Sequence, residues 1–372
     1  MTRRPVLAAA AIALSTLAAA VGVAPVPAGA GGDTIELFTE VDPGAVDGTY
    51  VPVAGNFSDV DFYDDVLWYA PGRGAESLWV DDGGVFAKRN LGNRVTGTFR
   101  PVVGDFAGDQ LDDIFWYAPG SAPDYLWVAS GDAAFTSIPV PVKGTYEPTV
   151  LHDDVGKDDI VWVKPSGGAT SVWSFTGQGA QHAVHPVSTI PGARPLVGDF
   201  DGNGFDDAFW YGPGSIPDAA WYGTGDGTFA VQSASVTGAY QPVVAQLTQS
   251  NGTQPRCDDQ SNEVPGPDQC EDILWYRASG PTKVWYGRGN RIFVSETTGS
   301  FGGSAGTPFA GVDGFVFLWS PAQKDKVFLD GTAWDSANSE VPGGYQPIVG
   351  NWAGVPGILF YRRGPAPEIW FQ

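Results

Sequence analysis

Histidine and cysteine are scarce in this chain of 372 residues, which contains three histidines and two cysteines. These side chains supply many nucleophiles, general bases and zinc ligands, so few such arrangements can be built from them. His152, His182 and His185 have no catalytic motif around them. His182 and His185 could share a strand edge as zinc ligands, but no third ligand lies nearby in the sequence, which favours a surface role.

Basic residues are also few, since 20 lysines and arginines stand against 42 aspartates and glutamates, a net charge of −22. Residues 1–30 contain two arginines and no acidic residue, so the rest of the chain has 18 basic and 42 acidic residues, a net charge of −24. Such a surface repels nucleic acid and anionic lipid and attracts cations or basic partners. We therefore expect no nucleic-acid partner.

Long hydrophobic runs are absent beyond the N-terminus. Residues 1–30 combine two early arginines, an apolar run over 6–24 and the small-residue sequence Ala28-Gly29-Ala30, as in a cleaved signal peptide. A membrane-spanning helix is the alternative, but Pro25 and Pro27 interrupt it. We expect a secreted protein without a membrane span, exported by either the Sec or the twin-arginine route.

A repeated sequence motif occupies most of the rest of the chain. Its opening prolines are separated by 49 and then 47 residues, at Pro52, Pro101, Pro148, Pro195 and Pro242, and further copies open at Pro308 and Pro347. The copy from Phe99 to Gly144 predicts strands at 101–106, 112–117, 124–129 and 135–142. Seven such units begin near residues 50, 99, 146, 193, 240, 306 and 345. They predict one all-β domain over 31–372, a seven-bladed β-propeller with four-stranded antiparallel blades.

The two ends of the repeat array predict how the ring closes. The last copy ends at Gln372 directly after its third strand, and the segment 34–48 resembles the end of the fourth copy at 228–238. We therefore expect the N-terminal strand to complete the last blade and close the ring, which removes an exposed sheet edge.

Tryptophan recurs in the second and third strands of the copies, the second-strand positions being Trp68, Trp116, Trp162, Trp210 and Trp275. Regular aromatic residues could form a ladder on which sugars stack. More often they pack one blade against the next, and this is the interpretation we favour.

The loop after the first strand of the fourth copy is rich in oxygen-bearing side chains. Asp199, Asp201, Asn203 and Asp207 would supply side-chain oxygens, and Phe205 its carbonyl oxygen, to one calcium ion. Calcium is a hard cation that takes about six to eight oxygen ligands. A solvated acidic turn is the alternative; we favour one structural calcium ion.

This loop resembles the FG-GAP, or VCBS, repeat family through the match Gly-Asp-Phe-Asp-Gly-Asn-Gly-x-x-Asp at 198–207. The resemblance covers nearly the whole chain, from about Asp33 to Gln372. It implies a propeller, usually of seven blades, with calcium in the loop between strands one and two, as in integrin α-subunits and secreted bacterial propellers. It also implies adhesion or carbohydrate recognition more than catalysis.

The second copy keeps Asp105, Asp109 and Asp113 but has Ala107 in place of an acidic ligand, which predicts a weaker second site. The remaining loops depart further from the motif, and in the fifth copy the loop is replaced by an insertion over 247–270.

That insertion contains both cysteines, Cys257 and Cys270. In an exported protein we expect them to form a disulfide. A metal or redox pair is the alternative, but neither a nearby histidine nor C-x-x-C spacing supports it.

Two patterns resemble catalytic motifs. Gly302–Gly306 matches G-x-S-x-G but lies in a Gly/Ser linker rather than at a strand-to-helix turn. Asp112 and Asp113 could be the carboxylates of a glycosidase, but their position at the start of the second strand explains them without catalysis. We find no nucleophile–base pair and no phosphate-binding loop.

An aromatic residue stands two residues before five of the opening prolines: Tyr50, Phe99, Tyr146, Tyr240 and Tyr345. The residues directly before the opening prolines are mostly polar or charged, and they include Arg100 and Arg194. We expect this ring on the face opposite the calcium loop, where it could bind glycans or peptides; a structural aromatic cap is the alternative.

These patterns favour a secreted, monomeric, non-enzymatic module that binds a glycan or an extracellular protein. A polysaccharide-active hydrolase or lyase on a propeller scaffold, and a structural surface protein without a discrete ligand, remain alternatives.

Overall fold

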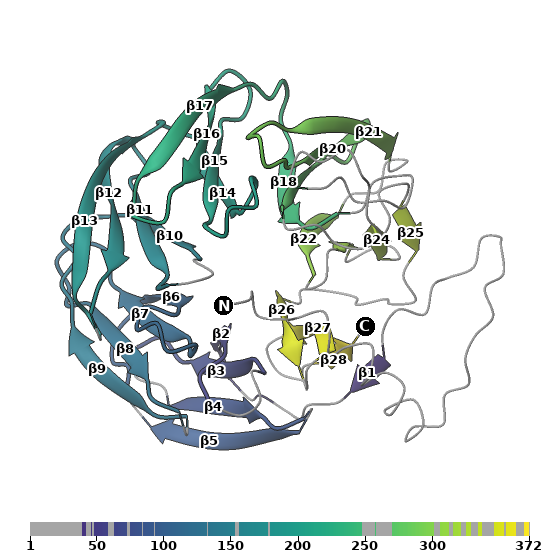
Figure 1. Ribbon diagram of the computed structural model, residues 1–372. Helices are drawn as coiled ribbons and strands as arrows, with labels where there is room; N and C mark the ends of the chain where they lie inside the picture. The colour runs from purple at the N-terminus through teal and green to yellow at the C-terminus, as the bar shows by residue number, and fades with distance from the viewer. Residues whose placement is uncertain are drawn as a thin grey trace.

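Seven antiparallel β-sheets are arranged around a common centre in the computed structural model, as Figure 1 shows. The structure describes residues 39–41, 46, 48–58, 63–72, 75–83, 85–92, 94–131, 133–152, 156–177, 179–247, 257, 270–300, 306–311, 315–320, 325–328, 334–336, 346–352, 355–361 and 368–371. The prediction of an all-β propeller is confirmed. The predicted signal peptide lies outside the described residues.

Six blades each take four consecutive strands from one stretch of chain. The first three blades consist of β2 (Val51–Gly55), β3 (Asp65–Tyr69), β4 (Glu76–Asp81) and β5 (Phe86–Gly92); β6 (Arg100–Gly104), β7 (Asp113–Tyr117), β8 (Tyr125–Ala129) and β9 (Phe135–Pro139); and β10 (Glu147–Leu151), β11 (Asp159–Val163), β12 (Gly168–Phe175) and β13 (His182–Thr189). The next three consist of β14 (Arg194–Gly198), β15 (Asp207–Tyr211), β16 (Asp218–Gly223) and β17 (Phe229–Ala234); β18 (Gln241–Ala245), β19 (Asp272–Tyr276), β20 (Pro281–Tyr286) and β21 (Val294–Ser300); and β22 (Thr307–Ala310), β23 (Val316–Trp319), β24 (Lys326–Phe328) and β25 (Trp334–Ser336).

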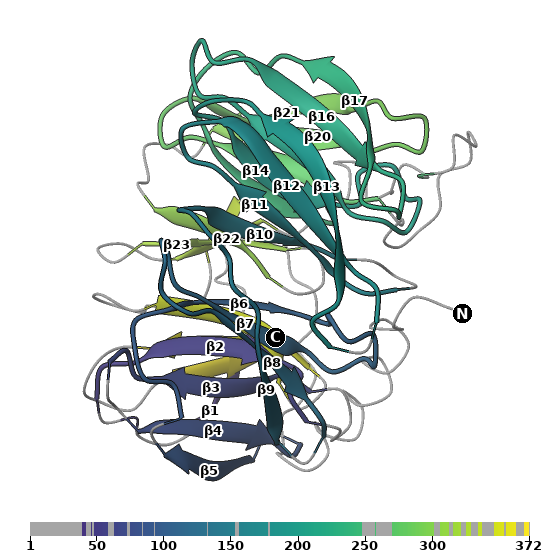
Figure 2. The same ribbon diagram turned by 90° about the vertical axis from the view of Figure 1, so that its left-hand side faces the viewer.

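The seventh sheet draws on both ends of the chain. It contains β26 (Gln346–Trp352), β27 (Val355–Tyr361) and β28 (Glu368–Phe371), and the three-residue β1 (Thr39–Val41) pairs with β28 so that Thr39 lies opposite Phe371. In every sheet the first strand of the repeat lies nearest the centre, and Figure 2 shows β2 to β5 following one another outwards. Among the described residues no helix is long and apolar enough to span a membrane.

The strands of the second blade lie close to the predicted ranges, except that β9 ends at Pro139 instead of residue 142. The chain leaves the outer strand there because Val140 and Val142 turn inwards and are buried. Their N–H groups donate to Asp124, at 3.1 Å to its carbonyl oxygen and 2.7 Å to its carboxylate.

The second strands explain why the blades pack so closely. All five residues of β7 are buried, as expected for a strand covered on both faces. Trp116 contacts Trp127 of its own blade and Tyr69 of the preceding blade, at ring-centroid distances of 5.3 and 4.8 Å. The equivalent tryptophans Trp68, Trp162, Trp210 and Trp275 are also buried, which confirms that this series packs blade against blade.

A repeated pair of hydrogen bonds joins adjacent blades where the first strand ends. The N–H of Asn56 donates to the carboxylate of Asp112 at 2.7 Å, and the N–H of Asp112 donates to the carbonyl of Asn56 at 2.7 Å. The carboxylate always belongs to the following blade. The same arrangement recurs at four further junctions, with donor–carboxylate distances of 2.7–2.8 Å, in the pairs Asp105–Asp158, His152–Asp206, Asp199–Glu271 and Asn351–Asp64.

Replacing one of these carboxylates should weaken the junction between two blades. We expect Asp112→Ala to lower the unfolding free energy by about 1–3 kcal/mol, because the N–H of Asn56 loses its charged acceptor. Urea unfolding measures this change. The control is Asp82→Ala, at an exposed acidic residue just after β4, with an expected change below about 0.5 kcal/mol. Equal effects of the two substitutions would contradict the inter-blade role.

Candidate metal centre

The loop between β14 and β15 brings three carboxylates together. One oxygen each of Asp199, Asp201 and Asp207 lies within 4.8 Å of the others, and all three residues are buried. Three clustered carboxylate oxygens suit a hard cation. The described residues therefore include a buried acidic group that could hold a metal ion, at the place where the sequence predicts one.

Backbone hydrogen bonds explain the shape of this loop. The two carboxylate oxygens of Asp199 accept the N–H groups of Asn203 at 3.1 Å and Gly204 at 2.9 Å. Asp201 accepts the N–H of Asn203 at 3.2 Å. Gly202 has a φ of +69°, a conformation that glycine adopts at little cost. The chain thus turns around its own acidic side chains.

Asp207 also holds its blade together. Its two carboxylate oxygens accept the N–H groups of Phe200 at 2.9 Å and Gly223 at 2.8 Å, which ties the chain after β14 to the end of β16. Asp65, Asp113 and Asp272 accept two backbone N–H groups in the same way in the first, second and fifth blades. The second acid of the pair thus has a structural role in these four blades, whether or not a cation binds.

Asn203 and Phe205, the other two predicted ligands, take part in the loop's own contacts. The side-chain nitrogen of Asn203 donates to the carbonyl of Gly223 at 2.9 Å, and its side-chain oxygen accepts the N–H of Phe205 at 2.8 Å. Asn203 therefore stabilises the loop conformation. Ligation by Asn203 and by the carbonyl of Phe205 stays a prediction.

The charges of the loop are only partly balanced. Burial raises the pKa of Asp207 to about 9, and the charges of Asp201 and Asp199 contribute to this increase. One basic side chain contacts the group, as Nε of Arg291 donates to Asp201 at 2.8 Å. Three carboxylates opposite one guanidinium make the loop attractive to a further cation.

The predicted second site looks different. Asp105 accepts the N–H groups of residues 108, 109 and 110, at 2.6, 3.1 and 2.8 Å, while Asp109 is exposed. Within the described part of this loop, Asp105, Asp109 and Asp113 do not form a three-carboxylate group like that of the fourth blade. The ammonium of Lys157 donates to the carbonyl of Ala107. Cation binding at this loop stays a prediction.

The predicted disulfide between Cys257 and Cys270 is present, with the Cα atoms 5.4 Å apart. It lies against the metal loop, because a β-carbon at position 202 would collide with the sulfur of Cys257. Glu271, which follows Cys270, accepts the N–H of Asp199 at 2.8 Å. The insertion thus supports the acidic loop.

Sequence analysis missed two residues at this site, Arg291 and Glu271. Glu271 could have been found by aligning Glu271-Asp272 with the Asp-Asp pairs of the other copies. Arg291 lies in the next blade, 84 residues after Asp207, and no local pattern marks it.

The aromatic residues at the other end of the first strands have structural contacts. Tyr146 covers Gly144, whose φ is +130°, and its ring centroid lies 6.0 Å from that of Trp162. The hydroxyl of Tyr117 accepts the N–H of Tyr146 and donates to the carbonyl of Gly144. Tyr50, Phe99 and Tyr240 repeat this cap, each beside a glycine with positive φ. Tyr345 lies outside the described residues, and ligand binding by the ring stays a prediction.

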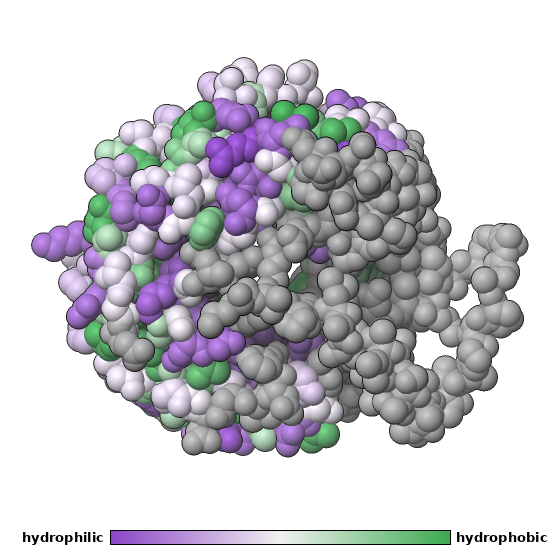
Figure 3. All heavy atoms as spheres, viewed as in Figure 1, coloured by the Kyte–Doolittle hydropathy of each residue, from purple (hydrophilic) through white to green (hydrophobic). Residues whose placement is uncertain are grey.

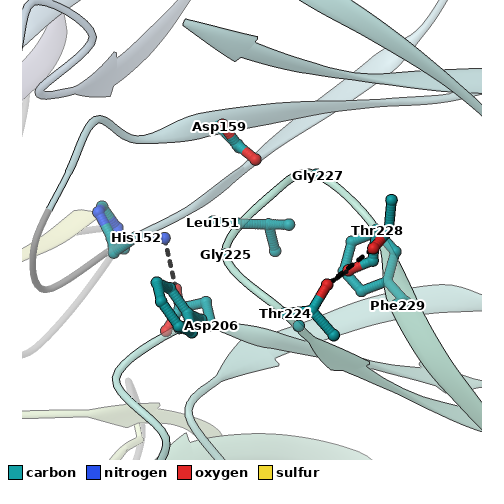
Figure 4. Close-up of a pocket in the computed structure, with 11 residues that line it drawn as sticks. Leu151, His152, Asp159, Asp206, Thr224, Gly225, Gly227, Thr228 and Phe229 are labelled. Carbon is teal, nitrogen blue, oxygen red and sulfur yellow. Dashed lines mark hydrogen bonds between the residues drawn. The ribbon is translucent and has the colours of Figure 1, made fainter. Parts of the chain in front are cut away.

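Figure 4 shows a small pocket between the third and fourth blades, lined by His152, Asp206, Thr224 and neighbouring residues. Desolvation lowers the pKa of His152, although its side chain is 65% exposed, and the hydrogen bond and charge of Asp158 and the charge of Asp206 raise the pKa more. The hydroxyl of Thr224 is engaged with Asp226 and Thr228. The arrangement therefore resembles a charged blade junction more than an acid–base site.

Fold and loop together define the class of protein as a β-propeller with a buried acidic group that could hold a metal ion. No protein-family model matches the chain, and no curated protein matches it.

The buried carboxylate of Asp65 makes stability depend on pH. Burial raises its pKa to about 6, despite the backbone N–H groups that it accepts. The native protein therefore holds this proton more tightly than the unfolded chain, and stability falls as pH rises from about 4 through about 6. Between about pH 4 and pH 7 we expect the protein to lose about 2 kcal/mol of unfolding free energy relative to Asp65→Asn. Urea unfolding at both pH values tests this, and parallel pH profiles would contradict it.

Proposed function

We propose that this chain is a secreted, non-enzymatic binding module of the FG-GAP or VCBS type that recognises a glycan or an extracellular protein. The observation that carries the proposal is a ring of exposed residues at the start of the seven innermost strands: Val51, Arg100, Glu147, Arg194, Gln241, Thr307 and Gln346. Six of the seven are polar or charged. Neighbouring blades thus offer hydrogen-bonding groups to one ligand near the centre of a rigid ring.

The burial pattern of the strands supports this choice of surface. In β2, β6 and β18 the first residue is exposed, the second and fourth are half-buried, and the third and fifth are buried. Arg100 therefore stands beside the aromatic cap of Phe99 without being packed beneath it, and Arg194, the first residue of β14, is also exposed. Figure 3 shows hydrophilic residues interspersed with hydrophobic ones on the described part of one face.

The engagement of the paired acids supports binding over hydrolysis. Asp112 accepts an N–H from the preceding blade, and Asp113 accepts two within its own blade. Carboxylates committed to the backbone are poorly placed to exchange protons with a glycosidic bond. Turnover on each bound glycan tests the hydrolase or lyase alternative directly.

We propose calcium as the cation of the fourth loop, in a structural role. Asp199, Asp201 and Asp207 would hold it, and Asn203, the carbonyl of Phe205 and water would complete a shell of about six to eight oxygens. The buried carboxylates and their excess negative charge support this proposal. The disulfide fits the oxidising compartment into which a signal peptide would direct the chain.

We further propose that β1 closes the ring. The pairing of β1 with β28 supports this, as do the hydrogen bonds of the Tyr361 hydroxyl with the carbonyl of Gly48 and the N–H of Tyr50, both at 3.2 Å. These contacts link the last sheet to the chain entering the first blade.

Calcium should stabilise the protein. At a calcium concentration about 100 times the dissociation constant, binding adds about 2.7 kcal/mol to the unfolding free energy, so the melting temperature should rise relative to a chelator. Asp201→Asn should abolish the rise, because it removes one of the three carboxylates. Asp201 is chosen over Asp207 because Asp207 also joins strands of its blade. Asp82→Asn, at an exposed acidic residue outside both loops, serves as the matched control and should keep the rise. A calcium response that survives in Asp201→Asn would contradict the site.

The ring of exposed residues should determine ligand binding. We expect the double variant Arg100→Ala with Arg194→Ala to bind at least about tenfold more weakly to any glycan that the wild type binds on an array. The reason is that two cationic hydrogen-bond donors are lost. Lys88→Ala with Arg89→Ala, on the outermost strand β5, is the matched control for charge. Unchanged binding in the first variant would exclude this surface. Product release from a bound polysaccharide would overturn the non-enzymatic proposal, and no binding on the array would favour a protein partner.

A further inference from the structure

Arg291 reaches the acidic loop from the neighbouring blade. It lies between β20 and β21 of the fifth blade, and its Nε donates to Oδ2 of Asp201 in the fourth blade at 2.8 Å. The side chain of Asp201 is 3% exposed, whereas that of Arg291 is 34% exposed. A partly solvated cation thus covers a buried carboxylate of the candidate metal centre.

Several further contacts fix the position of Arg291. Its backbone has a φ of +63°, its carbonyl accepts the hydroxyl of Tyr222 at 3.0 Å, and its guanidinium lies 5.3 Å from the centre of the Tyr222 ring. The N–H of Gly289, in the same turn, donates to the carbonyl of Cys257. The turn is therefore held against the loop by β16 on one side and by the disulfide-bonded insertion on the other.

A divalent cation and this guanidinium make opposing demands on Asp201. A cation bound among the three carboxylates would lie close to the guanidinium, and the two positive charges would repel each other at a buried position where solvent screens them little. Arg291 contacts Asp201, a carboxylate that the metal ion also requires. Metal binding therefore disfavours the contact between Arg291 and Asp201, and this contact disfavours metal binding.

We propose that Arg291 is an internal counter-ion that competes with the metal for Asp201, so that metal binding displaces Arg291 and loosens the contact between the fourth and fifth blades. This inference rests on the proposed calcium site. It assigns the loop two states. In one state Arg291 contacts Asp201, and in the other a metal ion is bound by the three carboxylates.

The second loop shows a related arrangement. Lys157 of the third blade donates from its ammonium to the carbonyl of Ala107 in the loop of the second blade. A β-carbon at Gly108 would lie 2.9 Å from the side chain of Lys157, so the lysine lies closely over the loop. In both loops a basic side chain of the following blade contacts the same position of the loop. This position is Asp201 in the fourth blade and Ala107 in the second.

Calcium titration by calorimetry on the full mature protein tests the competition. We expect Arg291→Gln to bind calcium about fivefold more tightly than the wild type and to melt at a lower temperature in chelator, because it lacks the competitor and the inter-blade contact. Arg277→Gln is the matched control, since this arginine of the same blade lies 5.5 Å from the ring of Tyr240 instead. The control should keep the wild-type affinity.

The outcomes separate this inference from the calcium site itself. Equal calcium affinity in wild type and Arg291→Gln would overturn the competition and leave the site standing. Calcium binding by Arg291→Gln alone would support competition in its strongest form. Absence of binding in both would overturn the site and the competition together.

Hydrogen–deuterium exchange gives a readout that does not depend on the variant folding normally. In the wild type, saturating calcium should protect the loop at 199–207 and increase exchange in the turn at 288–293. Protection of both segments would contradict displacement of Arg291.

Discussion

Buried carboxylates that accept backbone N–H groups are the interaction on which this ring depends. The first acid of each pair at the start of a second strand bonds to the preceding blade, as Asp112 does to Asn56. In four of the blades the second acid also accepts two N–H groups within its own blade, as Asp113 does. Strands that are apolar on both faces can slide over one another, because their packing is not directional. These charged acceptors fix the register between blades, and they account for part of the excess of acidic residues.

The same constraint shapes the candidate metal centre. Asp207 and the backbone of Asp199 make the same kinds of hydrogen bonds as Asp113 and the backbone of Asp105 in the second blade, so the fourth loop differs from the second mainly by Asp201 in place of Ala107. Asp201 adds a third carboxyl group at a buried point, and Arg291 contacts it. A cation in this loop would therefore leave the hydrogen bond from Asp199 to Glu271 in place and would compete only with the Arg291 contact.

Much of the fold could be predicted because the period is visible in the sequence and the second strands are uniformly apolar. The three clustered carboxylates and the disulfide were also predictable, since their spacing is local. Arg291 was not, because contacts between blades join residues far apart in sequence. Nor did the sequence distinguish a binding role of Tyr146 from a structural cap over Gly144, because both place an aromatic residue at the same turn. The end of β9 depended on the inward turn at Val140.

The pairing of β1 with β28 has a consequence for the order in which the molecule can be assembled. Six sheets use strands that are neighbours in the chain, so each can form as soon as its own stretch is available. The seventh must bring Thr39 and Phe371 together across almost the entire length of the polypeptide. Such a distant contact is slow to form, because the entropy of a long loop opposes it. A chain interrupted before its last strand would keep an unpaired sheet edge, which is a template for association with other chains.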